Sequence, residues 1–189
     1  NTLKLTKTAS NEVYVNQAMV TAADLSASNG IVHSIDAVLL SNETVIDVAI
    51  DNGFTTLVTA VVQEELVPAL SDPFANYTVF APSNAAFDNL ATELNTTVAG
   101  LLALPNLDDI LKYHVLGTQV LAADVTNGAV VNPLSTTNTL KMTKTSSNAV
   151  FVNQASVVTA DVQAENGVVH VIDQVVLPIN TVVDVALDN

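Results

Sequence analysis

The residues of this chain that could do chemistry are three histidines, three tyrosines and a scatter of carboxylates. Their densest grouping is the stretch DDILKYH, which holds Asp109, Ile110, Tyr113 and His114. A histidine that acts as a general base needs a nucleophile or a carboxylate placed beside it by the fold. No sequence pattern supplies such a partner for His114. We therefore favour a structural role, in which the imidazole ties two backbone segments together by hydrogen bonds.

The acidic residues do not form a catalytic or metal-binding pattern either. Glycoside hydrolysis needs two acids that face each other across a cleft, whereas the adjacent pairs Asp108–Asp109 and Glu64–Glu65 cannot face each other on a helix. The sequence has no calcium-loop or zinc-helix motif. It contains no cysteine, which excludes thiolate metal sites, disulfides and cysteine nucleophiles. We expect no enzymatic activity, no metal and no cofactor.

The charge of the chain excludes further classes of partner. Nineteen acidic residues against five Lys and Arg give a formal net charge of −14. A nucleic-acid-binding protein needs a basic face, and so does a protein that binds anionic membranes. No apolar run reaches the length of a membrane span. We therefore expect a soluble protein with no nucleic-acid partner and no membrane insertion.

The elements that must position these residues belong to a long internal repeat. Residues 1–52 align without a gap with residues 138–189, at an offset of 137, and 33 of the 52 pairs are identical. A period of this length matches a whole domain rather than a solenoid unit. We predict that residues 1–41 are the strand-rich, C-terminal half of one repeat, that residues 42–178 form a complete domain, and that residues 179–189 start the next repeat.

Periodicity and capping signals predict the elements of the complete unit. Four helices are expected, over residues 44–53, 55–68, 84–91 and 106–117, with Ser83 and Asn106 as N-caps of the last two. Residues 76–82 are expected to form a buried strand closed by a proline. After Gly128 the chain becomes rich in Thr and Val and predicts a run of strands. Helices followed by strands indicate an α+β fold.

Three segments of the unit resemble the signatures of the fasciclin-type adhesion domain. They are YTVFAPSNAAFDNL at residues 77–90, ILKYHVL at residues 110–116 and NGVVHVIDQVVLP at residues 166–178, in the family's order. The resemblance implies an α+β fasciclin-like domain, in which a helical layer packs on a β-sandwich or wedge, here in tandem repeats of 137 residues. Residues 1–40 resemble the C-terminal half of the family alone.

The resemblance also implies a function and a set of binding residues. It implies a secreted or surface-attached protein that serves cell–cell or cell–matrix adhesion; in animal members an Asp-Ile pair and a Tyr-His segment are associated with integrin binding. The matching residues here are Asp109, Ile110, Tyr113 and His114. We therefore expect an extracellular adhesion or structural module whose partners are copies of itself and a cell-surface or matrix protein or polysaccharide. Three N-x-T sequons, at Asn42, Asn76 and Asn95, are candidate glycosylation sites.

Two further expectations depend on the three-dimensional structure. The alternative function is a small-ligand or polysaccharide-binding domain that uses a cleft near Tyr113 and His114; a deep apolar pocket there would favour it, and a filled core would favour adhesion. The strand-rich residues 1–40 also lack a helical half of their own. We expect a neighbouring segment or molecule to complete them, head to tail or by swapping, and such contacts would propagate as a fibre or surface array.

Overall fold

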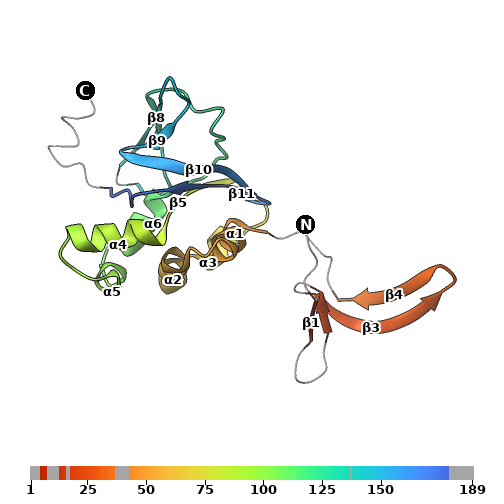
Figure 1. Cartoon of the computed structure of the whole chain (residues 1–189). Helices are drawn as coiled ribbons and strands as arrows, with labels where there is room; N and C mark the ends of the chain where they lie inside the picture. The colour runs from red at the N-terminus through yellow and green to blue at the C-terminus, as the bar shows by residue number, and fades with distance from the viewer. Residues whose placement is uncertain (1–4, 8–12, 16–17, 37–42, 137, 179–189) are drawn as a thin grey trace. The chain divides into compact units, whose positions relative to one another are not determined.

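The computed structural model describes residues 5–7, 13–15, 18–36, 43–136 and 138–178 (Figure 1). The chain divides into two compact units, residues 1–41 and residues 42–189. The predicted start of a next repeat at residues 179–189 and the sequon residue Asn42 lie outside the described residues. The domain boundaries proposed from the repeat stay a prediction.

The larger unit contains six helices and seven strands among its described residues. The helices are α1 Val45–Asp51, α2 Thr55–Gln63, α3 Val67–Leu70, α4 Asn84–Glu93, α5 Val98–Leu102 and α6 Leu107–Tyr113. The strands are β5 Tyr77–Pro82, β6 Val115–Leu116, β7 Ala129–Val131, β8 Leu140–Lys144, β9 Val150–Val152, β10 Ala155–Ala164 and β11 Gly167–Ile172. They form one sheet in the order β6-β5-β11-β10-β9-β8-β7, in which β5 and β11 run parallel and the other neighbours antiparallel.

Local capping explains where several of these helices begin. Thr44 and Asp47 form a reciprocal capping box at α1, and the Ser83 side chain accepts a hydrogen bond from the amide of Ala86 at α4, as predicted. Asn106 occupies the predicted N-cap position of α6, but its side chain makes no capping hydrogen bond.

The helix predicted over residues 55–68 is also corrected by the structure. It ends at Gln63, and Glu65 then takes a positive φ of 55°. The chain re-enters a short helix, α3, in which Pro68 lies in the first turn. Proline suits that position because its missing N–H would have no partner there. The proline therefore starts a new helix instead of ending the previous one.

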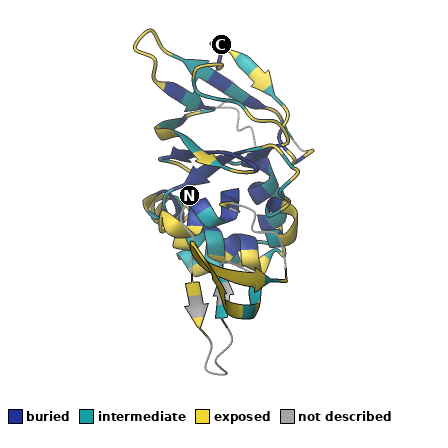
Figure 2. Ribbon diagram, turned by 90° about the vertical axis from the view of Figure 1, so that its right-hand side faces the viewer, coloured by how far each residue is buried: buried dark blue, intermediate teal, exposed yellow. Residues whose placement is uncertain are grey.

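The central strands are buried on both faces. Along β5, Val79 and Ala81 face the helices, whereas Phe80 joins a second core with Leu140, Met142 and other residues of the remaining strands, and all six residues of β11 are buried. Figure 1 shows the helices together on one side of β5 and β11, with β8 and β9 on the other side. Figure 2 shows the buried residues gathered at these two interfaces. A helical layer on a folded sheet is the α+β architecture that the sequence predicts.

Strand β10 allows the sheet to fold over the second core. Its register with β11 shifts between Val157 and Thr159 and again between Thr159 and Val162, and Asp161 has a positive φ of 58°. Irregular registers of this kind bend a strand and increase its twist. The N-terminal end of β10 therefore pairs with β9, while most of its length pairs with β11.

The smaller unit repeats the strands of the larger one. It contains β1 Leu5–Lys7, β2 Val13–Val15, β3 Ala18–Ala27 and β4 Gly30–Ile35, in the order β1-β2-β3-β4. The β3–β4 register is that of β10–β11, down to the two register shifts. The two units differ in burial: among the described residues of the smaller unit, Ala18 alone is buried. None of the described helices in either unit has the length and apolar character needed to cross a membrane.

Candidate functional site at the junction of α6 and β6

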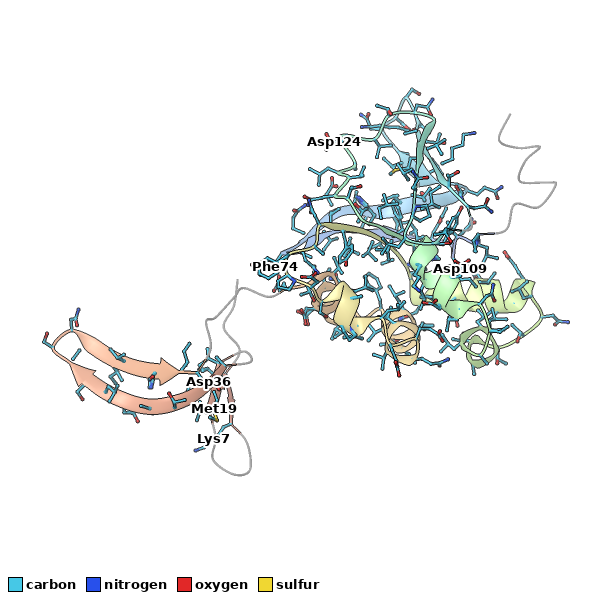
Figure 3. The ribbon with its side chains drawn as sticks, turned by 180° about the vertical axis from the view of Figure 1, so that it is seen from behind. Lys7, Met19, Asp36, Phe74, Asp109 and Asp124 are labelled. Carbon is cyan, nitrogen blue, oxygen red and sulfur yellow. The ribbon has the colours of Figure 1, made fainter. Side chains whose placement is uncertain are left out.

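The acidic first turn of α6 takes part in a hydrogen bond with Ser135 and in an exposed ion pair. The Ser135 hydroxyl donates to Asp109 Oδ1 at 2.7 Å, and the Ser135 amide donates to the carbonyl of Lys112 at 3.2 Å. Lys112 Nζ lies 2.8 Å from Asp108 Oδ2, and both side chains are more than two-fifths exposed. An exposed i,i+4 pair of this kind contributes little to stability. Figure 3 shows Asp109 on α6, well away from Phe74 in the loop before β5.

Tyr113 is a buried connector. Its side chain is fully buried, its hydroxyl donates to the carbonyl of Thr139 at 2.7 Å, and it accepts from Asn153 Nδ2 at 3.2 Å. The ring belongs to the core between β5 and the strands β8 to β10. The hydroxyl therefore joins the end of α6 to the segment that leads into β8 and to the β9–β10 turn.

His114 ties α6 to the segment that follows β11. Its Nε2 accepts a hydrogen bond from the amide of Val176 at 3.0 Å, so the ring proton lies on Nδ1, which donates to the carbonyl of Ile110 at 2.7 Å. Burial in an apolar environment lowers the pKa of His114 to about 4, and the hydrogen bond to Ile110 opposes that shift only in part. The ring is therefore neutral at physiological pH. These contacts confirm the structural tie predicted from the sequence.

The four predicted binding residues are neighbours in space, but three of them are buried. Ile110, Tyr113 and His114 are 6%, 0% and 2% exposed, and Asp109 is partly exposed. An apolar cavity of about 20 Å³ lies against His114, between α1, α2 and β5. That volume holds about one water molecule and no organic ligand. The binding role of the four residues stays a prediction, and the geometry gives the buried three a place in the core.

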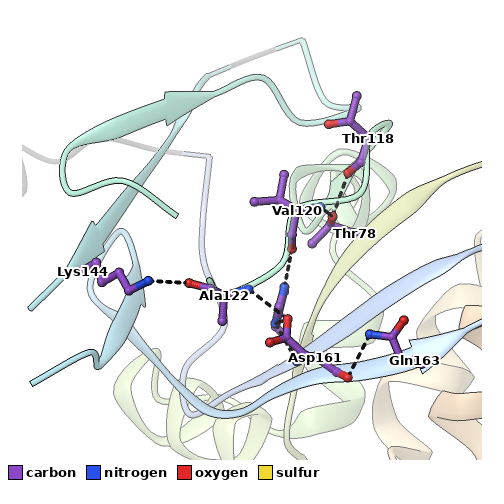
Figure 4. A network of polar contacts seen from close by, with 8 residues as sticks. Thr78, Thr118, Val120, Ala122, Lys144, Asp161 and Gln163 are labelled. Carbon is purple, nitrogen blue, oxygen red and sulfur yellow. Dashed lines mark hydrogen bonds and ion pairs between the residues drawn. The ribbon is translucent and has the colours of Figure 1, made fainter. Parts of the chain in front are cut away.

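His170 forms the centre of a second polar network. The Asp161 amide donates to His170 Nδ1 at 3.2 Å, so Nε2 carries the proton and donates to the carbonyl of Val120 at 2.8 Å. The Thr78 hydroxyl donates to the carbonyl of Thr118 and accepts from the amide of Val120 (Figure 4). His170 Nε2 and the Thr78 hydroxyl thus hold the loop that follows β6 against the central strands, whereas His170 Nδ1 bonds to β10.

The same loop is fixed from its other side by charged residues. Asp161 Oδ1 accepts from the amide of Ala122 at 2.9 Å, and Lys144 Nζ donates to the carbonyl of Ala122 at 2.9 Å (Figure 4). Lys144 Nζ also donates to the carbonyl of Ala123 at 3.1 Å. These bonds satisfy backbone groups that have no strand partner. The network therefore has a structural role in the larger unit.

Asn166 is a structural residue that the sequence analysis missed. It is fully buried; its Oδ1 accepts from the amide of Val45 at 2.9 Å, and its Nδ2 donates to the carbonyls of Leu70 and Asp72 at 2.8 and 3.0 Å. The side chain therefore joins the start of α1 and the end of α3 to the β10–β11 turn. The sequence signal is the repeated Asn-Gly pair, which by local pattern predicts only a hairpin turn.

The glycine of that pair permits a close contact between two backbones. A β-carbon at Gly167 would lie 2.1 Å from the carbonyl oxygen of Tyr77, and the residue has a φ of +151°. Any side chain would therefore push β5 away from β11. The pair Asn166–Gly167 fixes where the parallel strand and the first helix meet the strand-rich half.

The larger unit also has a polar surface hollow of about 450 Å³. It is lined by Asn127, Gly128, Lys141, Thr143, Phe151, Asn153 and Gln154. Through Asn153 it reaches the hydroxyl of Tyr113. This hollow is of ligand size and lies near the predicted site, although it is polar and open, whereas a deep apolar pocket is the expected sign of small-ligand binding.

Three further features of the described residues bear on binding, namely metal-ligand clusters, the sequons and exposed apolar side chains. No group of three His, Asp or Glu side chains in the described part of the chain could hold a metal ion. The sequon residues Asn76 and Asn95 are exposed. Phe74 is 93% exposed, more than any other large apolar side chain among those described.

The fold has a close counterpart among solved structures. A fasciclin domain pair from the insect cell adhesion molecule fasciclin I superposes with a TM-score of 0.61 and 19% sequence identity, over 93% of this chain and 66% of that one. At that identity the likeness shows the fold alone. Together with the three sequence signatures, it defines the class as a fasciclin-type α+β domain.

The family follows from the sequence comparisons. The Fasciclin domain profile matches residues 1–41 and 52–178, and the chain belongs to that family. Protein sll1483 of Synechocystis is 44% identical over 139 residues, which cover 71% of this chain and 73% of that protein. Transforming growth factor-beta-induced protein ig-h3 of Sus scrofa is 34% identical over 88% of this chain, which spans 24% of the length of that protein.

Proposed function

We propose that the chain is an extracellular, non-enzymatic adhesion or structural module that binds through its outer surface. Its partners are copies of itself and a cell-surface or matrix protein or polysaccharide, and its units join into an array or fibre. Membership of the Fasciclin domain family supports this proposal, as does the fold shared with an insect cell adhesion molecule.

The observation that carries the proposal is that the polar groups near α6 form hydrogen bonds within the unit itself. The functional atoms of Tyr113 and His114 bond to backbone groups or to Asn153, and the cavity beside His114 is about 20 Å³. A filled core leaves no apolar pocket there for a substrate or small ligand. Recognition by this unit then uses exposed residues.

Phe74 is the first surface residue to test. Exposed aromatic side chains are enriched among residues that dominate binding energy at protein interfaces. Beads coated with the protein should aggregate, or adhere to matrix-coated surfaces, and Phe74→Ser should weaken this by at least severalfold. Leu94→Ser is the matched control, because Leu94 is also exposed, at 53%, but lies at the end of α4.

Both variants should keep the melting temperature of the unmodified protein, because neither side chain belongs to the core. Equal adhesion by the Phe74→Ser variant would exclude Phe74 as a contact. A complete lack of adhesion by the unmodified chain, to itself and to matrix proteins and polysaccharides, would refute the adhesion proposal.

A second candidate function is polysaccharide binding in the polar hollow. Its lining contains amide and ammonium side chains together with the partly exposed ring of Phe151, and sugars bind to such combinations by hydrogen bonds and ring contacts. Most of this lining recurs in the first copy of the repeat. Lys141, Thr143, Asn153 and Gln154 correspond to the identical residue types at positions 4, 6, 16 and 17, and Phe151 corresponds to Tyr14.

Calorimetric titration with neutral and acidic oligosaccharides tests this candidate. Phe151→Ala should abolish any binding, whereas Val130→Ala, on the exposed side of β7, should leave it unchanged. If oligosaccharides bind equally well to both variants, the hollow is not the site.

A further inference from the structure

The polar hollow lies on the face of β8 and β9 that points away from the core. Along β8, Lys141 and Thr143 line the hollow and alternate with two residues of the core beneath. On β9, Phe151 is paired in register with Thr143 and lies between two buried valines. Since successive side chains of a strand point to opposite faces, Lys141, Thr143 and Phe151 project from the same outer face.

Asn153 fixes the shape of one end of the hollow. It lies in the β9–β10 turn with a positive φ of 52°, its amide donates to the carbonyl of Lys141 at 2.7 Å, and its Oδ1 accepts from the amide of Lys141 at 2.9 Å. Its Nδ2 donates to the hydroxyl of the buried Tyr113. These contacts order the backbone that carries the Lys141 side chain, so a ligand that binds there has little ordering of the protein to offset.

The hollow belongs to a part of the chain that has no acidic residue. Residues 125–160 contain two of the five basic residues, Lys141 and Lys144, and no Asp or Glu. All nineteen acidic residues are in the rest of the chain, with the other three lysines. Asp124 and Asp161 flank the segment, and neither lines the hollow. At physiological ionic strength charges act over about 8 Å, so the local charge matters more here than the net charge of the chain.

We propose that the hollow binds an anionic segment of a polysaccharide, a proposal that rests on the second candidate function above and adds the charge of the ligand. A carboxylate or sulfate group on the sugar pairs with the ammonium group of Lys141. The C–H bonds of the sugar ring pack against Phe151, because the face of an aromatic ring carries partial negative charge. Thr143 and the amide side chains of the lining bond to the sugar hydroxyls.

A neutral sugar fits the hollow less well than an anionic one. It would remove water from part of the Lys141 ammonium group without supplying an opposite charge. A hydrogen bond to an ionised acceptor is also roughly twice as strong as one between neutral groups. Because the hollow is open, it accommodates a sugar whose neighbours in the polymer remain in solvent. An acidic peptide offers carboxylates but no sugar ring to pack against Phe151.

The test is calorimetric titration of the protein with a short oligogalacturonate, which carries a carboxylate on each sugar, and with its methyl ester, which has the same sugars without the charge. A sulfated galactan oligosaccharide and its desulfated form test sulfate in the same way. At least one anionic form should bind about tenfold or more tightly than its uncharged counterpart. The difference should decrease as sodium chloride is added, because salt screens the ion pair.

Lys141→Gln should weaken binding of the anionic oligosaccharide by at least about tenfold, the usual effect of losing a hydrogen bond to a charged group. Lys141→Arg should keep most of the binding, because it keeps the charge. Lys112→Gln is the matched control, since it changes the net charge equally at an exposed lysine of α6 outside the hollow. In NMR titrations of the unmodified protein, the amide resonances of Thr143 and Phe151 should move and those of α1 should not.

Four results would overturn the proposal. Equal binding of the charged and uncharged forms would leave polysaccharide binding in place but remove its dependence on charge. Equal weakening by Lys141→Gln and Lys112→Gln would show non-specific attraction. A self-association that Lys141→Gln abolishes, with no sugar bound, would identify a second copy as the occupant. If no oligosaccharide binds in any form, the second candidate function fails as well.

Discussion

At the scale of single residues, His114 shows what one sequence reveals about a role. The absence of a catalytic pattern around it predicts a structural histidine, and the structure confirms a tie between two backbone segments. The partners were not predictable, because Val176 lies 62 residues further along the chain and approaches only when β11 is in place. The burial of Tyr113 was not predicted either, since a motif associated with binding suggests exposure.

Replacement of His114 by alanine should destabilise the larger unit by about 1–3 kcal/mol. The change leaves the Val176 amide and the Ile110 carbonyl without partners in a buried site, and unsatisfied groups of this kind cost that much. Urea denaturation measures the effect, and adhesion should decline only as the folded fraction declines. His33→Ala, at an exposed position, is the matched control. Lost adhesion at an unchanged stability would instead assign His114 a direct contact.

His114 should also make the unit sensitive to acid. Its pKa is about 4 in the folded state and 6.5 in the unfolded chain, so the unfolded state binds a proton first as the pH falls. The stabilisation that comes from keeping His114 neutral and buried is therefore complete above pH 6.5. It is lost progressively as the pH falls from 6.5 to 4, and below pH 4 this group changes the stability no further. The loss should reach roughly 3 kcal/mol.

The measurement is the unfolding free energy of the protein and of His114→Gln from pH 8 to pH 3.5. Both share all carboxylates, so the difference between the two curves isolates the histidine. Parallel curves over the whole range would contradict a depressed pKa.

At the scale of elements, the helices meet the strand-rich half through Asn166. One buried side chain holds the first turn of α1, the end of α3 and the β10–β11 turn. An Asn-Gly pair between two strands is the usual sign of a hairpin turn, and that local signal concealed the long-range role. Comparison of the two repeats could have revealed it, because both residues recur at Asn29 and Gly30.

Asn166→Ala should lower the stability of the larger unit by at least about 2 kcal/mol, since three backbone groups lose a buried partner. Amide exchange at Val45 should accelerate more than exchange in β8 and β9, which Asn166 does not touch. Asn29→Ala in the same chain is the matched control and should change neither quantity. Equal effects of the two substitutions would show that the side chain matters for the turn and not for the junction of elements.

Other elements show why local sequence patterns predict whether a segment is a helix or a strand better than they predict where it ends or bends. The strand β5 and the Ser83 cap follow from propensity and hydrogen-bonding chemistry within a few residues, and both are confirmed. The break between α2 and α3 and the bend in β10 depend on residues with positive φ, Glu65 and Asp161. Neither is a glycine, the residue that most readily adopts a positive φ, so the sequence gives no strong local signal for these two positions.

At the scale of the whole molecule, the two copies of the repeated strand-rich sequence differ in how far their residues are buried. Residues 167–172 are buried throughout, whereas residues 30–34 are exposed. Strand propensity is common to both copies, but hydrophobic burial requires the helical half. Because burial of apolar surface is the dominant favourable term in folding, the larger unit should account for nearly all the cooperative stability of this chain.

Scanning calorimetry can test this assignment of stability. Globular proteins unfold near 60 °C with about 0.7 kcal/mol of enthalpy per residue, so residues 43–178 alone correspond to about 95 kcal/mol and the whole chain to about 130 kcal/mol. We expect a single transition close to the smaller value. Deletion of residues 1–41 should leave both its midpoint and its enthalpy unchanged, because Ala18 is the one buried residue described there. An enthalpy near the larger value, or a clear loss on deletion, would mean that the smaller unit already has a cooperative partner in the isolated chain.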